Sequence, residues 1–268
     1  MNLEILSEIP PGEPKTNAIL FVHGMWHGAW CWKEHFLPYF KEKSYASYAV
    51  SLRGHGDSTL AGEINSASIT DYIADIHEAI RIIAKPTILV GHSMGGYLVQ
   101  KYMEKYKTTG GVLLASVPPG GPVMASVNVF VCRMFTFCCC LALRNLKPLV
   151  EKKKDTKHWL FSDSVDSVTI DRINRKLCNE SLKAYLQMFK DIFKVLISRN
   201  KADRPKIPIM VIGATSDRLI SECSVNRTAK YYTDMNAQFI PGAHDIMLEP
   251  TWKQAADAIV DWLNENKL

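Results

Sequence analysis

The residue best suited to chemistry in this sequence is a serine held between glycines. The segment 91–95, GHSMG, follows the apolar run 87–90 and precedes a helical pattern that begins near Gly96. In this strand-turn-helix context a sharp turn exposes the serine hydroxyl at a helix N-terminus, where backbone N–H groups favour a developing negative charge. Ser93 is therefore predicted to be a nucleophile that attacks an acyl carbon.

A serine hydroxyl becomes a useful nucleophile only when a base removes its proton and a third group holds that base in the right tautomer. His244 follows the apolar run 237–240, and Asp217 follows the apolar run 207–212. Serine, then aspartate, then histidine is the chain order that accompanies this type of serine turn. We predict His244 as the base and Asp217 as the residue that orients it.

Other residues could fill these two roles. Asp217 could instead close a turn or cap a helix, which would leave Asp245 or Glu222 as the acid. Four further histidines lie in earlier loops, which are expected to serve other purposes: His23, His27, His55 and His92. The choice of Asp217 and His244 rests on their positions after the last two predicted strands.

Two backbone N–H groups are expected to stabilise the oxyanion that forms when the serine attacks. Met94, directly after the nucleophile, supplies the first. The second comes from the loop 23–26, HGMW, in which a glycine lets the backbone bend toward the serine. Met25 is the predicted donor there, with Trp26 as the second choice. The side chains of Trp26 and His92 are predicted to contact the substrate.

No motif for a metal ion or an organic cofactor accompanies these residues. The cysteines and histidines lack the spacing of zinc ligands. The segment 52–58, LRGHGDS, is glycine-spaced and charged, but it lacks the Gly-Lys-Ser/Thr ending of a phosphate loop. We interpret it as a tight loop beneath the site, fixed by hydrogen bonds of Arg53 and Asp57, and expect a reaction without metal or cofactor.

Short apolar runs rich in β-branched residues alternate with helical patterns along the chain, which is typical of βαβ units that form a mostly parallel sheet. Six strands are predicted, over residues 17–22, 47–52, 87–90, 111–115, 207–212 and 237–240. Helices are predicted over residues 30–41, 69–83, 224–232 and 251–264, and Thr70 and Asp71 are suited to capping the second of these. The expected fold is α/β, with a central, mostly parallel sheet flanked by helices.

The alternation stops after residue 119 and returns only after residue 204. The span between them is too long for a structureless loop, and it contains a helical stripe over residues 181–197. We predict a core domain over residues 1–119 and 205–268, with an inserted helical cap over residues 120–204 that lies above the carboxyl edge of the sheet.

Within the predicted cap, residues 127–143 are unusually apolar. The stretch is shorter than the roughly 20 residues that cross a bilayer and contains Arg133, so a transmembrane helix is not expected. The favoured interpretation is a helix whose apolar face lines a substrate cleft, which implies a ligand with an apolar part. At most, the cap is expected to make peripheral contact with a membrane.

Composition narrows the class of protein. The net charge of the 268 residues is +5, and the basic residues are scattered apart from a short cluster, which argues against nucleic acid as a partner. That cluster, Lys152, Lys153, Lys154 and Lys157, is interpreted as a solvated turn, with contact to an anionic membrane as the alternative. The acidic, proline-containing N-terminus and seven cysteines without a spaced framework favour a cytoplasmic protein with reduced thiols. The oligomeric state is left open.

Together these residues resemble the α/β-hydrolase superfamily, in particular its small capped serine esterase and lipase-like members, over nearly the whole chain. The matching positions are 23–24, 30, 52–56, 91–96, 217 and 241–244. The stretch 23–32, HGMWHGAWCW, also resembles the plant methylesterase and hydroxynitrile-lyase group, in which this loop borders the acyl pocket. Residues 52–56 and the apolar cap depart from the pattern of that group.

The resemblance implies a serine hydrolase that cleaves a small-molecule carboxylic ester through an acyl-enzyme. Ser93 in place of an aspartate argues against dehalogenase and epoxide hydrolase chemistry, which proceeds through an alkyl-enzyme ester. Three alternatives stay open: a C–C hydrolase, a hydroxynitrile-lyase-like enzyme, and a non-catalytic ligand receptor on the same scaffold. A lyase would need a further proton-transfer group from the cap, for which Lys183 and Lys190 are the candidates.

Overall fold

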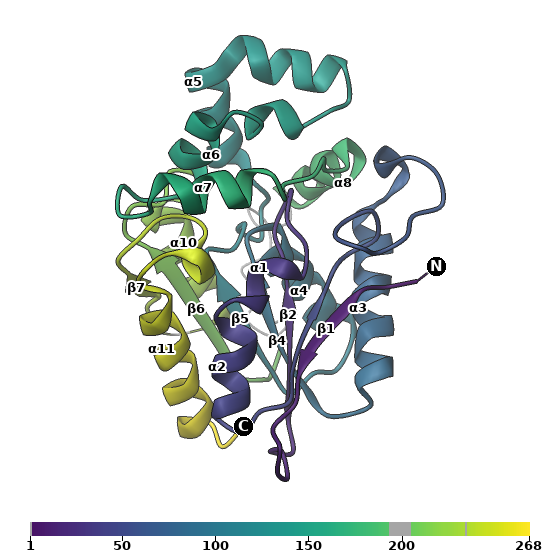
Figure 1. Cartoon of the computed structure of the whole chain (residues 1–268), viewed down its shortest axis with the longest axis vertical. Coiled ribbons are helices and arrows are strands. Elements are labelled where there is room, and N and C mark those ends of the chain that lie inside the picture. The colour runs from purple at the N-terminus through teal and green to yellow at the C-terminus, as the bar shows by residue number, and fades with distance from the viewer. Residues whose placement is uncertain (1, 193–204, 234) are drawn as a thin grey trace.

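The computed structural model describes residues 2–192, 205–233 and 235–268. Its centre is a seven-stranded sheet in the order β1-β3-β2-β4-β5-β6-β7 (Figure 1). The strands are β1 Ile5–Glu8, β2 Ala18–Val22, β3 Ser47–Val50, β4 Thr87–His92, β5 Gly110–Leu114, β6 Ile209–Ala214 and β7 Gln238–Ile240. Neighbouring strands run parallel except β1, which is antiparallel to β3. The predicted α/β fold with a mostly parallel sheet is confirmed.

All six predicted strands are present, with ends that differ by a few residues. The sequence does not predict the edge strand β1. Its four residues, ILSE, are too few to show a period of two, and they are held by pairing with β3, where Ile5 lies opposite Val50. The inner strands β2, β4 and β5 are fully buried, which explains why they appear in the sequence as uninterrupted apolar runs.

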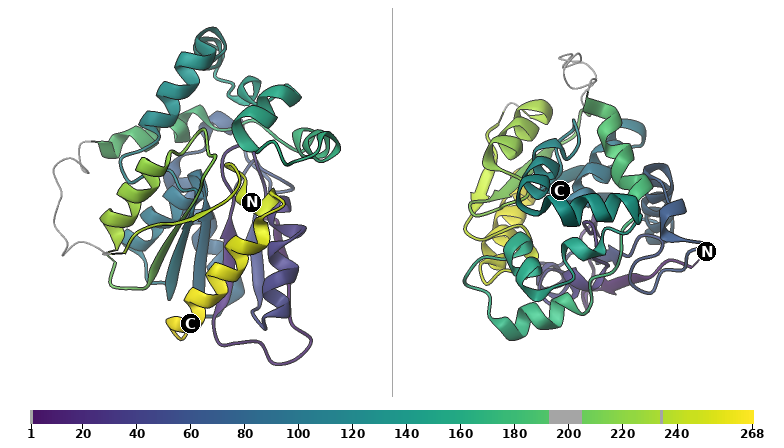
Figure 2. Two further views of the ribbon diagram at one scale, coloured as in Figure 1. Left: turned by 90° about the vertical axis from the view of Figure 1, so that its left-hand side faces the viewer. Right: turned by 90° about the horizontal axis from the view of Figure 1, so that it is seen from above.

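Helices cover both faces of the sheet. On one face α2 Phe36–Glu42 packs with α11 Trp252–Glu265, and on the other α3 Ile69–Ile83 packs with α4 Met94–Lys105 (Figure 1). Figure 2, left, shows α10 Glu222–Tyr232 and α11 on opposite sides of the sheet. This three-layer arrangement buries the sheet and leaves its carboxyl edge for the loops that carry the candidate site.

One predicted helix is in fact two. Residues 30–41 form α1 Trp30–Lys33 and then α2, with a break at His35. Pro38 explains the break, because proline lacks an N–H and is tolerated only in the first turn of a helix. A new helix that begins at Phe36 places Pro38 in that first turn.

The N-terminus of α3 is capped by a different residue from the one predicted. Ser68, not Thr70, is the N-cap, and its Oγ accepts the Asp71 N–H at 3.2 Å. The Asp71 carboxylate in turn accepts the Ser68 N–H at 2.9 Å, which completes a capping box. Asp71 thus helps to cap the helix as predicted, whereas Thr70 does not.

The loop 52–58 is fixed by only one of the two residues expected to fix it. The Arg53 guanidinium donates to the buried Asp75 carboxylate of α3, at 2.6 Å for the shortest contact. The Asp57 side chain makes no hydrogen bond to any residue that the structure describes, and only its backbone N–H donates, to Glu4 at 3.1 Å. Asp57 points into solvent because Glu4 and the backbone of the turn already satisfy this end of the loop.

Between β5 and β6 the described residues contain helices but no strand, and these helices lie above the carboxyl edge of the sheet (Figures 1 and 2). They are α5 Val123–Ala142, η2 Lys147–Leu149, α6 Lys153–Leu160, α7 Ser167–Asn174, α8 Leu182–Gln187 and η3 Met188–Asp191. Two further short 3-10 helices are η1 Ile64–Ser66 and η5 Ile246–Leu248. Of the helix predicted over residues 181–197, α8 and η3 form the first part, and 193–197 lie outside the described residues. The division into a core and a cap domain stays a prediction.

α5 is longer than the apolar stretch 127–143 suggested. It spans 20 residues and is kinked at Arg133, where φ is −141° and ψ is 41°. The argument from length against a membrane-spanning helix is therefore wrong, although the kink and an ion pair between Arg133 and Asp155 of α6 remain. The interpretation of the lysine cluster as a turn is wrong as well, since all but Lys152, the N-cap, lie on α6.

Candidate active site

The strand-turn-helix around Ser93 forms where the sequence predicts it. β4 ends at His92, α4 begins at Met94, and Ser93 between them has φ 52° and ψ −118°. A non-glycine residue at positive φ is strained, and such strain is typical of this turn. A side chain at Gly95 would collide with backbone carbonyl groups at the end of β2, so glycine is required for α4 to start so close to that strand.

Ser93, His244 and Asp217 lie in one hydrogen-bonded row. The Ser93 Oγ lies 2.9 Å from the His244 Nε2, and the His244 Nδ1 lies 2.8 Å from a carboxylate oxygen of Asp217. The three residues follow β4, β7 and β6, whose carboxyl ends meet at one edge of the sheet. In this arrangement His244 can take a proton from Ser93 while Asp217 holds the tautomer of the ring.

The Asp217 carboxylate also closes a turn. Its second oxygen accepts the N–H of Leu219 at 2.8 Å and the N–H of Ile220 at 2.9 Å. The alternative role predicted for Asp217 therefore applies to the same side chain, and the turn fixes the oxygen that faces His244. Glu222, one of the rival acids, is exposed at the start of α10.

Opposing effects set the charge state of His244. Burial lowers the pKa of an imidazole, but the charge and the hydrogen bond of Asp217 outweigh burial and raise the pKa of His244 above its ordinary value of 6.5. A higher pKa makes the ring a stronger base. The neutral ring that can accept the Ser93 proton then becomes the main form only above that raised pKa.

The second rival acid, Asp245, pairs with a different histidine. Its carboxylate lies 2.9 Å from the His27 Nε2, and both side chains are buried. The other ring nitrogen of His27 lies 2.7 Å from the Met25 carbonyl oxygen. A carboxylate and a carbonyl both accept hydrogen bonds, so the His27 ring is held between two acceptors. Burial raises the pKa of Asp245, but the neighbouring His27 overrides burial and lowers it.

Three successive carbonyl groups of the loop after β2 are held by hydrogen bonds. The Gly24 carbonyl accepts from the ring of the preceding histidine at 2.8 Å, and the Met25 carbonyl accepts from His27. The Trp26 carbonyl accepts from the N–H of Cys178 at 2.9 Å. In a trans peptide the N–H points away from the carbonyl to which it is joined. The N–H groups of Met25 and Trp26 are thereby aimed away from these partners.

The predicted oxyanion donors are available. Within the described part of the chain, the N–H groups of Met25, Trp26 and Met94 donate to no other residue. Trp26 has φ 66°, a strained conformation that its neighbours must maintain. The structure thus leaves both candidates of this loop, Met25 and Trp26, able to bind an oxyanion together with Met94.

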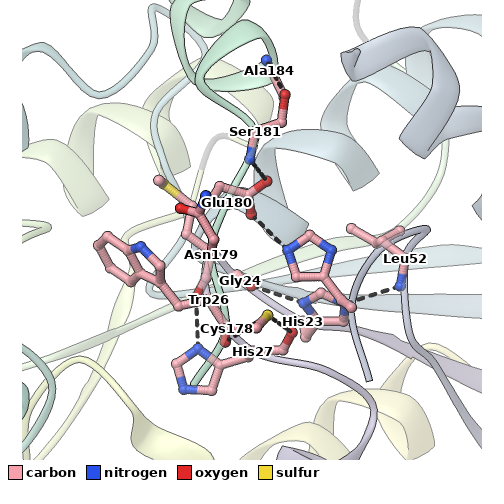
Figure 3. A network of polar contacts seen from close by, with 12 residues as sticks. His23, Gly24, Trp26, His27, Leu52, Cys178, Asn179, Glu180, Ser181 and Ala184 are labelled. Carbon is pink, nitrogen blue, oxygen red and sulfur yellow. Dashed lines mark hydrogen bonds and ion pairs between the residues drawn. The ribbon is translucent and has the colours of Figure 1, made fainter. Parts of the chain in front are cut away.

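A segment of the predicted cap reaches the same loop. The Cys178 thiol, like its N–H, contacts the Trp26 carbonyl, at 3.3 Å. Two residues on, the Glu180 carboxylate lies 3.2 Å from the His55 Nε2 and 2.7 Å from the Tyr72 hydroxyl, and these side chains are buried. Figure 3 shows Trp26 beside Cys178, with Glu180 on the same loop segment as Cys178. Burial lowers the pKa of His55, but the Glu180 charge outweighs burial and raises it.

Two other histidines are neutral. The Leu52 N–H donates to the His23 Nε2 at 3.0 Å, and the His92 Nε2 donates to the His244 carbonyl at 2.9 Å. Burial lowers the pKa of both rings, that of His92 to about 3. His92 therefore holds the backbone of His244, while its Nδ1 has no hydrogen-bond partner among the described residues.

A pocket opens above Ser93. Trp26 and His92, the two residues predicted to contact the substrate, both line it, as does His244. Its roof and walls are almost entirely apolar and include Val117, Ala125, Val129, Phe137, Leu146, Leu149, Leu160, Leu219 and Ile220. The pocket therefore suits a ligand whose reactive carbonyl is attached to an apolar group.

His92, His244 and Asp245 present possible ligand atoms within 4.8 Å of one another. Both ring nitrogens of His244 already face Ser93 and Asp217, and the His92 Nε2 faces a carbonyl. Because these atoms are engaged in the hydrogen bonds that position His244, the cluster does not form a separate metal site.

Sequence reasoning misses His27, Asp245, Cys178 and Glu180 as residues that position the site. Two weak signals point to the first pair: Asp245 directly follows the base, and His27 stands beside the loop predicted to bind the oxyanion. No sequence signal points to Cys178 or Glu180, because a loop between helices gives no indication of which part of the core it contacts.

The sequence is similar to several known proteins. Norfluorocurarine synthase 1 of Strychnos nux-vomica is 34% identical over 110 residues, which cover 39% of this chain and 40% of the synthase. Methyl jasmonate esterase 1 of Vitis vinifera is 29% identical over 117 residues, which cover 40% of this chain and 42% of the esterase. Each match spans less than half the length of the relative. Monoacylglycerol lipase ABHD6 of Bos taurus is 22% identical over 260 residues, which cover 92% of this chain and 75% of the lipase.

The fold is shared with solved structures. A thermophilic esterase from Thermogutta terrifontis superposes with a TM-score of 0.72 at 18% identity, over 98% of this chain and 93% of that chain. A monoacylglycerol lipase of Paleococcus ferrophilus superposes with a TM-score of 0.71 at 19% identity, over 99% of this chain and 100% of that chain. The profile of the Alpha/beta hydrolase family matches residues 19–261, nearly the whole sheet and both sides of the candidate site. The chain belongs to the alpha/beta hydrolase family, as its sequence motifs predict.

Proposed function

We propose that the protein hydrolyses small carboxylic esters that have an apolar part, through an acyl-enzyme on Ser93. The observation that carries the proposal is the row from Ser93 through His244 to Asp217, which opens into an apolar pocket. Similarity to a methyl jasmonate esterase and a monoacylglycerol lipase supports ester cleavage as the reaction. The reaction needs no group beyond the residues already described and water.

In the first half-reaction, His244 accepts the Ser93 proton as the Oγ attacks the ester carbonyl carbon. The resulting oxyanion is bound by the N–H of Met94 and that of Met25, with Trp26 as the alternative donor. The bond to the alcohol oxygen then breaks, and the proton passes from His244 to the leaving alcohol. The acyl group stays on Ser93.

In the second half-reaction, water replaces the alcohol. His244 removes a proton from the water, whose oxygen attacks the acyl carbon and forms a second oxyanion in the same place. When this intermediate collapses, the Ser93 oxygen leaves and recovers its proton from His244. The products are the carboxylic acid and the regenerated enzyme.

Hydrolysis is favoured over the lyase alternative by the position of the two lysines that a lyase would need. Lys183 is exposed and donates to the Ser66 carbonyl at 2.9 Å, and Lys190 is exposed as well. Neither lines the pocket above Ser93. A cationic proton donor for lyase chemistry is therefore lacking among the described residues of that pocket.

The first test is hydrolysis of p-nitrophenyl esters of graded chain length by the wild type and by Ser93→Ala. We expect turnover with a chain-length optimum set by the pocket, and background rates for Ser93→Ala. A fluorophosphonate probe should label the wild type but not the variant. Labelling without turnover of any ester would favour the C–C hydrolase or lyase alternatives, and tight ligand binding without labelling or turnover would favour the receptor.

We also propose a cytoplasmic location. All seven cysteines are free, and Cys132, Cys138 and Cys223 are exposed. Exposed thiols remain unpaired in a reducing compartment, which supports the proposal. Fractionation of cells that express the full chain tests it, and recovery from the secretory pathway with oxidised cysteines would contradict it.

A further inference from the structure

α5 presents an apolar surface that no other described element covers. Of its 20 residues only Val129 and Cys140 are buried. Twelve large apolar side chains are exposed in the described part of the chain, and seven of them lie between residues 124 and 143. Val131 is 74% exposed and Phe135 is 81% exposed. A helix whose outer face meets only water normally carries polar residues there, so this composition requires another explanation.

The pocket explains only one side of α5. Ala125, Val129 and Phe137 line the pocket above Ser93. Exposed residues recur every three or four positions on each side of the kink at Arg133, at 124, 127 and 131 before it and at 135 and 138 after it. In each segment they lie along a side of the helix other than the one that lines the pocket. This outward face contains no charged residue, since Arg133, the one charged residue of α5, is turned to its ion pair on α6. A substrate in the pocket therefore does not need this outward face.

A basic segment follows α5. The ion pair between Arg133 and Asp155 joins the middle of α5 to the start of α6, and three lysines directly precede Asp155. Of these, Lys152 and Lys154 are exposed and form no ion pair with any described residue. Residues 143–157 contain six basic and two acidic residues. In Figure 1, α6 lies directly below α5, so this basic segment is next to α5 in space as well as in the sequence.

We propose that α5 docks on the surface of an anionic lipid membrane. The outward face would enter the boundary between headgroups and acyl chains, and the lysines beside it would contact the lipid phosphates, as in other amphipathic interfacial helices. Charge selects this partner over a second copy of the chain, because two copies would bring two equally basic segments together.

Surface docking fits the structure better than a spanning helix. By length and composition α5 is the single helix in the described part of the chain that could cross a bilayer. Its inner side, however, closes the pocket above Ser93, and Arg133 at its centre holds the mostly buried Asp155. Docking would place the pocket beside dissolved apolar esters. That consequence rests on the proposed function, whereas the docking itself does not.

The test is co-sedimentation of the full-length protein with vesicles of phosphatidylcholine, with and without phosphatidylserine. We expect binding to the anionic vesicles. The combined change Val131→Glu and Phe135→Glu should weaken this binding by about tenfold or more, because two apolar side chains no longer leave water when the protein docks. Lys152→Gln and Lys154→Gln should each weaken it roughly fivefold. The matched control is Val168→Glu, which alters a 77% exposed valine on α7 and should bind like the wild type.

Ser93→Ala should bind vesicles like the wild type, and the α5 variants should cleave a short soluble ester at the wild-type rate, which separates docking from catalysis. The proposal would be overturned if the combined Val131→Glu and Phe135→Glu variant bound anionic vesicles as well as the wild type does. It would also be overturned if Val168→Glu weakened binding as much as that combined variant. Equal binding to neutral vesicles would overturn it too, because it would remove the role of the lysines. A dimer that Phe135→Glu dissociates, without vesicle binding, would identify a second copy as the partner. Resistance to alkaline extraction would identify a spanning helix.

Discussion

Two regions lie on opposite sides of the pocket above Ser93: the loops beneath it, called the floor, and α5 above it, called the roof. Both differ from the usual distribution of charged and apolar side chains. In the floor, His27 and Asp245 form a hydrogen-bonded pair of ionisable side chains, yet their exposed fractions are 1% and 0%. In the roof, Val131 and Phe135 of α5 are apolar, yet 74% and 81% exposed. Charged side chains are normally exposed and large apolar ones buried, so each region departs from the rule in the opposite direction.

This difference indicates what each region is built to contact. A buried charge is costly unless it is paired and hydrogen-bonded, and in return the pair fixes its surroundings in one arrangement. The His27–Asp245 pair does so for the Met25 carbonyl. The outer side of α5 has no such partners within the described residues, so its composition reflects something outside the chain. The side chains of the floor hold neighbouring groups in place, whereas those on the outer side of α5 suit contact with a partner outside the chain.

The largest expected effect is in the floor, at Asp217. Asp217→Asn preserves the shape of the side chain but removes the charge that orients His244, and we expect kcat to fall about 10⁴-fold. Steady-state hydrolysis of a p-nitrophenyl ester measures this. Asp245→Asn is the matched control, because it removes the neighbouring carboxylate instead. A smaller loss for Asp217→Asn than for Asp245→Asn would show that Asp245 is the acid.

The pH profile gives a second measurement of the same contact. Burial lowers the pKa of His244, but Asp217 outweighs burial and raises it above 6.5. In the proposed mechanism the neutral ring is the active form, so kcat/KM of the wild type should increase with pH through a pKa above 6.5 and then level off. In Asp217→Asn the residual activity should level off at lower pH. An unchanged profile would mean that another group controls the acid limb.

The next effect tests whether the buried pair of the floor positions the oxyanion loop. We expect His27→Gln and Asp245→Asn each to lower kcat by about 10- to 100-fold, less than the loss of a whole oxyanion donor, with KM little changed. The double variant should lose no more than either single variant, because the two side chains act as one unit. Increased KM at normal kcat would instead place the pair in substrate binding.

The fold shows which features a single sequence reveals. The turn at Ser93 and the inner strands were predictable because each carries a local signal: glycines at fixed spacing, or an uninterrupted apolar run. β1 was not, because four residues at a sheet edge acquire their structure from pairing with β3. The break at His35 could have been inferred from Pro38, which marks a first helical turn.

The candidate site likewise contains residues that the sequence predicts and residues that it does not. Ser93, Asp217 and His244 each follow a predictable strand, so their chain positions indicated that they would meet at one edge of the sheet. His27 and Asp245 lie 218 residues apart in the sequence, and neither sits in a motif that names the other as its partner. Contacts of this range depend on how loops fold over the sheet, which local patterns do not encode.

A smaller effect is expected at Glu180, where the segment between β5 and β6 contacts His55 and Tyr72. Glu180→Gln should lower the free energy of unfolding by about 1 kcal/mol, the typical net contribution of one hydrogen bond. Although burial opposes it, Glu180 raises the pKa of His55, so this stabilisation is fully present below the unfolded pKa of about 6.5 and is lost as pH rises through the folded pKa. Urea unfolding of both proteins across this range should therefore show their difference shrinking with increasing pH. Glu78→Gln, at an exposed pair with Arg81, is the control and should show no such trend. A pH-independent difference would indicate that His55 is neutral in the folded protein.

The smallest expected effect comes from the outward face of α5, and two valines two residues apart provide the comparison. Val129 is 7% exposed and faces the pocket, whereas Val131 is 74% exposed. Val129→Ala removes buried methyl groups and should cost about 1 to 2 kcal/mol of unfolding free energy. Val131→Ala should change it by less than about 0.5 kcal/mol, as for other exposed positions. If Val131→Ala destabilised the isolated protein as much as Val129→Ala, the outward face would be part of the folded core. The contrast between floor and roof would then reflect packing within the chain, and no membrane would be needed to explain the composition of α5.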